Sequence, residues 1–254
     1  ASISANGTID TVKEVTPESL KAAYDSMLQN DKVDIYVVGD INMEEITEKL
    51  REVFSFGDRE LYENKINTEV DTKPEEYTKE QKEMKQGKLH IGFSTPVYFG
   101  NPDFPKMQIF NGIFGGYPHS KLFMNVRERE SLAYYASSSY ASQYGLIFVT
   151  SGIEPSNEKK AIEVINEQLK AMQNGEISDL ELTQTKAMLT NQLKEALDSA
   201  RGQIEIYDQY KDLKEAFTID TWASRWQQVT KEDVQQMAKQ VKQEAIYFLC
   251  GKED

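Results

Sequence analysis

The amino-acid sequence predicts an α+β fold in which helices pack on one face of a mainly antiparallel sheet. Apolar residues alternate with polar or small ones over residues 88–96, the period of a half-buried strand. Residues 133–142 and 146–154 form two further strand-like runs separated by Gln-Tyr-Gly, which indicates a hairpin. Helical patterns dominate residues 157–242, before a last apolar run at residues 245–251. Such an order of strands followed by helices is typical of this class.

The first 54 residues predict two helices around one strand. A helix over residues 16–30 begins with Thr-Pro, an N-cap followed by the first-turn residue that helices prefer. The β-branched run at residues 33–39 predicts a strand. Asn42 then caps a helix predicted over residues 43–54.

A partial repeat suggests how the chain is divided. The capped helix and aromatic-centred strand of residues 16–39 recur at residues 230–251. Residues 67–87 are rich in charge and poor in apolar residues, as expected of a solvated linker or an exposed arm. We therefore predict the tail of a first, truncated module at residues 1–66, and a complete second module at residues 88–254.

Within the second module the helical periodicity predicts a series of helices. A capping box formed by Ser178 and Glu181 marks the start of a long helix through about Leu197, which we expect to continue past Gly202 toward Leu213. A short helix around Trp222 to Trp226 should pack through its tryptophans. The other predicted helices cover residues 102–114, 120–130, 157–173 and 230–242.

Composition excludes several classes of function. The chain has 254 residues, 42 acidic and 29 basic, and a net charge of −13, which argues against nucleic acid or anionic lipid as partner. No apolar run approaches the roughly 20 residues of a membrane span. Cys250 is the only cysteine, and its apolar surroundings predict a buried strand position. With no signal-peptide layout at residues 1–15, the expected location is cytoplasmic.

Metal and nucleophile motifs are missing from the sequence. The only histidines, His90 and His119, begin neither H-x-x-E-H nor H-E-x-x-H, so no zinc site is expected in this chain. A site made from both histidines and a carboxylate is the less favoured alternative. There is no G-x-S-x-G, P-loop or G-x-G-x-x-G motif, and Gly112, Gly115 and Gly116 are interpreted as a helix end and turn.

The segment from Phe114 to Tyr134 carries a family resemblance. It contains a Gly-Gly turn, a Ser-x-Leu-Phe helix start and the pattern Arg-Glu-x-x-x-Leu-Ala-Tyr. We call residues 114–134 the signature segment. It resembles the second, zinc-free half of the inverzincin zinc peptidases, the group of pitrilysin, insulysin and the mitochondrial processing peptidase. The resemblance implies the half-module fold of that group, with the zinc motif in the other half.

The resemblance also implies two site residues, Arg127 and Tyr134. An Arg fork can hold a substrate carbonyl, and a Tyr hydroxyl can donate to an oxyanion, a contact that lowers the barrier by about 3 kcal/mol. Without the resemblance, Arg127 would be interpreted as part of an exposed, salt-bridged helix end and Tyr134 as a packing residue. Tyr135 competes with Tyr134, because strand alternation sends only one of them to a given face, and the family spacing selects Tyr134.

These observations predict the substrate-binding, non-zinc half of a metallopeptidase. Such a chain binds peptide, supplies Arg127 and Tyr134, and is inactive alone. Zinc is expected in a complementary half or subunit over which this chain closes, and self-association is also compatible with a partly apolar exposed face. The main alternative is a catalytically inactive family member that acts as a binding or scaffold subunit. A third possibility is an acidic interaction protein unrelated to peptidases.

Overall fold

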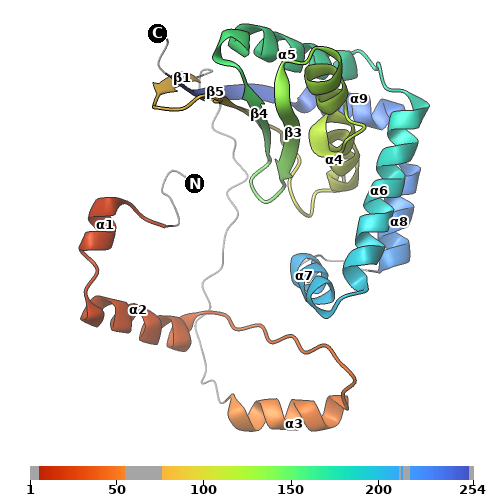
Figure 1. The fold of residues 1–254 in the computed structure, drawn as a ribbon. Helices are drawn as coiled ribbons and strands as arrows, with labels where there is room; N and C mark the ends of the chain where they lie inside the picture. The colour runs from red at the N-terminus through yellow and green to blue at the C-terminus, as the bar shows by residue number, and fades with distance from the viewer. Residues whose placement is uncertain (1–5, 55–75, 212, 214–217, 252–254) are drawn as a thin grey trace. The chain divides into compact units, whose positions relative to one another are not determined.

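The computed structural model describes residues 6–54, 76–211, 213 and 218–251. The chain forms two compact units, residues 1–65 and 66–254, and each is described by itself (Figure 1). No helix in the described ranges combines the length and the apolar character that crossing a membrane requires.

The described part of the first unit contains three helices, and both helices predicted there are confirmed. Thr16 caps α2 by accepting a hydrogen bond from the Ser19 amide, and Asn42 caps α3 in the same way through the amides of Glu44 and Glu45. The helices are α1 (Ile9–Lys13), α2 (Pro17–Asn30) and α3 (Met43–Val53).

The prediction of a strand over residues 33–39 is wrong. These residues lie between α2 and α3 without strand structure, and the first unit contains no strand in its described part that could pair with them. A strand is stabilised by its neighbours, so a β-branched run without a ladder partner is not enough. None of residues 6–54 is buried, and Val33, Ile35 and Val37 are exposed.

The second unit is built on a five-stranded sheet, and the predicted α+β fold with a mainly antiparallel sheet is confirmed. The strand order is β1-β5-β2-β4-β3, in which only the β1–β5 pair is parallel. The strands are β1 (Glu76–Gln81), β2 (Gly87–Ser94), β3 (Ala133–Ala141), β4 (Leu146–Ile153) and β5 (Lys242–Cys250).

Edge strand β1 falls inside residues 67–87, predicted as a solvated linker or an exposed arm, so a linker is wrong for residues 76–81, which form an exposed edge strand. All six residues of β1 are exposed. The strand is held through its ladder with β5 rather than through a buried face, which explains why no apolar alternation marked it. Residues 67–75 lie outside the described part of the chain, and the division into a truncated and a complete module stays a prediction.

Helices cover one face of the sheet (Figure 1). Alternate residues of β2 and β4, among them Leu89, Ile91 and Val149, point into the core, whereas His90 and Phe148 lie on the opposite face. The helical segments are α4 (Phe104–Asn111), the π-helices η1 (Gly112–Gly116) and η2 (Phe123–Arg129), the 3-10 turn η3 (Pro155–Asn157), α5 (Glu158–Gln173), α6 (Asp179–Leu197), α7 (Ala200–Tyr210), α8 (Ile219–Gln228) and α9 (Lys231–Gln240).

Several packing predictions are confirmed. Trp222 and Trp226 are both buried, one helical turn apart on α8. Cys250 is fully buried at the end of β5. The 143–145 turn joins β3 and β4 as a hairpin, with Gly145 at a positive φ of 62° that favours glycine.

The long helix expected from Ser178 toward Leu213 is interrupted. The Ser178–Glu181 capping box opens α6 as predicted, but α6 ends at Leu197 and Ser199 caps a separate helix, α7. The start of α7 passes close to the end of α6, and this approach requires Gly202, because a Cβ atom there would lie 1.9 Å from the carbonyl oxygen of Ala196. The break is therefore a packing feature that helical periodicity does not reveal.

Replacing Gly202 by alanine should reduce stability. The added methyl group would meet backbone rather than a flexible side chain, so we expect a cost of about 2–3 kcal/mol in the free energy of unfolding, measured by urea denaturation. Arg201→Ala, at the exposed neighbouring position, is the control and should change stability by less than about 0.5 kcal/mol. Equal effects of the two substitutions would contradict the close contact.

Candidate functional site

The signature segment, residues 114–134, runs from the helical layer to the edge of the sheet. It contains the end of η1, the whole of η2 and the start of β3. π-helical turns are rare and frequently occur at functional sites. Gly115 permits the closest approach to the sheet, because a Cβ atom there would lie 2.6 Å from the backbone nitrogen of Ser138.

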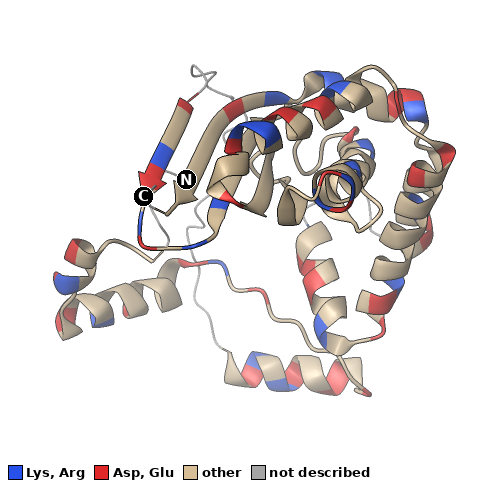
Figure 2. Cartoon of the chain, turned by 45° about the horizontal axis from the view of Figure 1, so that its top comes forward, with Lys and Arg blue, Asp and Glu red and all other residues tan. Residues whose placement is uncertain are grey.

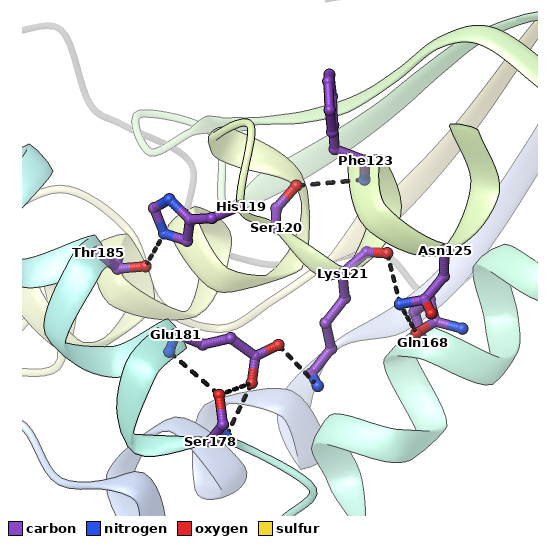
Figure 3. Close-up of polar contacts among 9 residues, drawn as sticks. All are labelled: His119, Ser120, Lys121, Phe123, Asn125, Gln168, Ser178, Glu181 and Thr185. Atoms are coloured by element: carbon purple, nitrogen blue, oxygen red, sulfur yellow. Dashed lines mark hydrogen bonds and ion pairs between the residues drawn. The ribbon is translucent and has the colours of Figure 1, made fainter. Parts of the chain in front are cut away.

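An almost buried ion pair fixes the middle of this segment to α6. Lys121 Nζ lies 3.0 Å from Glu181 Oε1, and the two side chains are only 11% and 18% exposed (Figure 3). Glu181 also accepts hydrogen bonds from the amide and hydroxyl of Ser178 through its other carboxylate oxygen, both at 2.8 Å. One carboxylate therefore caps α6 and anchors the signature segment at the same time.

These contacts determine the charge state of Glu181. Burial raises its pKa, but the hydrogen bonds from Ser178 and Lys121 and the charge of Lys121 outweigh burial and hold the pKa below its ordinary value. Glu181 is therefore ionised at neutral pH. Its contribution to stability is present above the ordinary carboxyl range and is lost as the pH falls through the lowered pKa.

Two further contacts flank the ion pair (Figure 3). The Nε2 atom of His119 lies 2.9 Å from Oγ1 of Thr185, a buried residue of α6. On the other side, the Asn125 amide donates to the Lys121 carbonyl at 2.9 Å and to Gln168 Oε1 on α5 at 2.8 Å. The segment is thus held between two helices before it reaches Arg127.

Arg127 lies near the end of η2 and is partly exposed. Its guanidinium carbon is 4.6 Å from the centre of the Phe123 ring, and its Nη1 atom is 3.4 Å from Glu128 Oε1. Stacking on an aromatic ring restricts an Arg side chain while leaving its donor fork available. Arg127 is therefore exposed and salt-bridged, as expected from sequence alone. Its guanidinium fork can still bind a ligand from this position.

Tyr134 occupies a β-bulge. Ala133 pairs with Ile153 and Tyr135 with Gly152, so Tyr134 has no partner in the ladder. Bulges re-aim side chains and often occur beside functional sites. The bulge breaks strict alternation, and both Tyr134 and Tyr135 are exposed, at 62% and 41%. Alternation therefore does not decide between the two tyrosines, and the choice of Tyr134 over Tyr135 stays a prediction.

The hydroxyl of Tyr134 donates a hydrogen bond to Glu154 Oε1 at 3.0 Å. This bond and the negative charge of Glu154 raise the pKa of Tyr134, so the phenol remains a proton donor at neutral pH. Sequence reasoning missed Glu154. The hairpin register was the available signal, because pairing of residues 133–142 with 146–154 places Glu154 beside the start of the first strand.

A single strained residue lies between Arg127 and Tyr134 in the chain. Ser131, between η2 and β3, has a φ of +52°, and it is the only non-glycine residue with positive φ in the described part of the chain. A left-handed conformation costs a non-glycine residue about 1–2 kcal/mol. Strain of this kind is often found at functional sites.

Metal binding finds no support in the described residues. No group of three His, Cys, Asp or Glu side chains among them could hold a metal ion. His90 lies on β2, on the face of the sheet opposite the core, and His119 is bound to Thr185 on α6. Burial lowers the pKa of both histidines, but they do not converge. The residues present therefore do not fit a catalytic zinc site.

Comparison with known proteins gives the class of this fold. Residues 14–189, more than half of the chain, match the family described as "Peptidase M16 inactive domain". The chain belongs to this family, and the resemblance predicted from the signature segment is confirmed. It is an inactive M16-type domain, a non-catalytic, peptidase-like half.

Individual relatives agree with this assignment. The chain is 40% identical over 250 residues to a probable inactive metalloprotease, YmfF, of Bacillus subtilis, covering 98% of this chain and 58% of the relative. A crystal structure of a conserved protein from Enterococcus faecalis matches with 38% identity and a TM-score of 0.91, over 99% of this chain and 60% of that one. A peptidase M16 inactive domain from Pseudomonas fluorescens shares the fold at 15% identity and a TM-score of 0.77, over 98% of this chain and 61% of that one.

Removing one partner of the Lys121–Glu181 pair should destabilise the second unit. Lys121→Met leaves an almost buried carboxylate without its cation, so we expect a loss of about 2–3 kcal/mol in the free energy of unfolding, measured by urea denaturation. The exposed pair Lys160–Glu163 provides a matched control, and Lys160→Met should cost less than about 0.5 kcal/mol. Similar losses for both variants would contradict an anchoring role.

Stability should also fall as the pH is lowered from 7.5 to 5. Because burial lowers the pKa of His119, the folded state binds a proton more weakly than the unfolded state. The stabilisation is complete above the ordinary His pKa of 6.5 and is lost as the pH falls through the lowered value. His119→Gln should reduce the slope of unfolding free energy against pH, and His90, whose pKa is also lowered by burial, supplies part of what remains. An unchanged slope would show that His119 does not titrate differently on folding.

Proposed function

We propose that this chain is the peptide-binding, zinc-free half of a metallopeptidase, and that it supplies Arg127 and Tyr134 to a zinc site carried by a complementary half or subunit. The observation that carries the proposal is the bulge that turns Tyr134 out of the ladder, directly after the helical turn that presents Arg127. Membership in the inactive M16 family supports the class of protein.

The edge strand β3 supports peptide binding. Natural proteins protect sheet edges with charged residues, and β1, at the opposite edge, has three among its six residues. In contrast, β3 and its neighbour β4 contain none, in a chain in which 28% of residues are charged (Figure 2). No described strand pairs with the outer edge of β3. An extended peptide can add to such an edge through main-chain hydrogen bonds.

The two side chains would then act on the peptide carbonyl. The Arg127 guanidinium presents a fork of donors that can hold a carbonyl or carboxylate oxygen. The protonated Tyr134 hydroxyl can exchange its bond to Glu154 for one to the oxygen that becomes negative during hydrolysis. Zinc in the complementary half would supply the Lewis acid and activate water there.

The first unit supports the existence of a complementary half. Residues 6–54 contain no buried residue, while apolar side chains such as Leu20, Tyr24 and Val53 are exposed. Taken by itself, such a unit needs further surface to pack against, which the rest of the chain or another half can supply. The chain also spans only 58% of the Bacillus relative and 60% of the Enterococcus chain. The partner we propose is the zinc-bearing half, in the same polypeptide or as a separate subunit.

A catalytically inactive scaffold subunit is the second candidate. Arg127 and Tyr134 are both engaged by acidic neighbours, Glu128 and Glu154, and these contacts would serve a purely structural hairpin equally well. The Bacillus subtilis relative reported above is itself described as a probable inactive metalloprotease. A scaffold of this kind would keep the fold and the partner surface without needing either side chain.

In an assembly with the zinc-bearing half, Tyr134→Phe should lower the kcat for a quenched fluorescent peptide about a hundredfold and change KM little. The reason is that the lost donor acts on the oxyanion rather than on the bound substrate. Tyr135→Phe removes the neighbouring hydroxyl and is the matched control, with turnover expected to stay within about twofold.

Unchanged turnover in Tyr134→Phe would reject the assigned role of this residue. If the unmodified assembly does not hydrolyse peptides but still binds them, the scaffold candidate gains support. Arg127→Ala then decides whether the signature segment takes part in that binding.

A further inference from the structure

The second unit contains a pocket whose lining residues are all uncharged. It has a volume of about 360 Å³ and lies between the end of β3, α4, η1, α6 and α7. Its polar lining includes Gln108, Asn111, Ser138, Gln192 and Gln209. The lining contains no Asp, Glu, Lys, Arg or His, although more than a quarter of the chain is charged. Volumes of this size are typical of sites for small ligands.

Hydrogen bonds orient two of the amide groups. Ser138 Oγ donates to Asn111 Oδ1 at 2.8 Å, and the Tyr117 hydroxyl donates to Gln192 Oε1 at 2.7 Å. Both bonds use the oxygen of the side-chain amide, so the NH2 groups of Asn111 and Gln192 are left as donors. Within the described ranges, neither NH2 group has a protein partner. Gly116 keeps the first amide accessible, since a Cβ atom there would lie 3.1 Å from Asn111 Nδ2.

Aromatic side chains complete the walls. Phe104, Tyr117 and Tyr140 line the pocket, and the Tyr140 hydroxyl is occupied by its bond to the Val97 carbonyl at 2.6 Å. The rings therefore offer mainly apolar surface. A ligand that fits has an apolar stem and a neutral head that can both donate and accept hydrogen bonds, because the lining offers amide and hydroxyl groups but no counter-ion for a charged head.

We propose that this pocket is a specificity subsite that takes an uncharged amide side chain, Asn or Gln, of a peptide bound to the domain. The inference rests on the proposed peptide-binding function and adds a preferred residue class to it. Its location supports the assignment, because β3 forms one wall and is also the strand along which a peptide would lie. The volume exceeds that of one amide group, so part of the adjoining peptide backbone also fits.

The test compares two capped pentapeptides, acetyl-Ala-Ala-Gln-Ala-Ala-amide and its Glu counterpart, in binding to the 254-residue chain at neutral pH. Calorimetry or NMR titration should show the Gln peptide binding at least about tenfold more tightly. Gln192→Glu and Gln209→Glu each place a negative charge at the pocket, and both residues are exposed, so the fold should tolerate them. Either substitution should lower the affinity for the Gln peptide and leave the Glu peptide poorly bound.

Gln184→Glu is the matched control. It makes the same change at an exposed position of α6 outside the pocket, and the preference for the Gln peptide should persist. Equal binding of both peptides, no binding of either, or unchanged Gln affinity in both pocket variants would overturn the inference. If the Gln preference and its loss in the pocket variants hold while Tyr134→Phe leaves hydrolysis unchanged, the pocket stands and the catalytic role of Tyr134 fails.

Discussion

The Lys121–Glu181 ion pair is the interaction on which the arrangement of the signature segment depends. The chain must pass from the helical layer to the sheet edge within a short stretch, and its polar groups need partners inside the fold. Glu181 meets two requirements at once, since it caps α6 and neutralises Lys121 almost out of solvent. The close approach of Gly115 to Ser138 then brings the same segment against β3. Helix capping, charge pairing and sheet contact are therefore coupled at one place.

Strand β3 connects the two proposed sites. Tyr134 stands at its start, in the bulge, while Ser138 and Ser139 near its other end line the polar pocket. Ser139 lies five positions after Tyr134, a distance of about 17 Å along an extended strand. A peptide of six or so residues lying along this edge would meet both sites. The absence of charge from β3 and β4 allows such a peptide to approach without meeting a fixed charge on either strand.

Much of the fold could be predicted because the signals are local. Thr16 and Ser178 mark helix starts through hydrogen bonds to residues three positions away, and those helices form as expected. The alternation in β2 and the turn at residues 143–145 are equally local, and they establish the hairpin and the core face of the sheet. The signature segment was long enough to indicate the family. Arg127 and Tyr134 could be named as candidates only through that resemblance.

Contacts between distant parts of the chain decided the features that the sequence did not predict. The β-branched run at residues 33–39 forms no strand in the described first unit, whereas the charged residues 76–81 form one, because pairing requires a neighbour and not only a propensity. The bulge at Tyr134 and its bond to Glu154 arise from the register with β4. The sequence by itself determined most of the helix starts, the hairpin and the family. Tertiary structure decided which edges pair, where Tyr134 points and which five elements enclose the polar pocket, since these depend on packing between segments far apart in the chain.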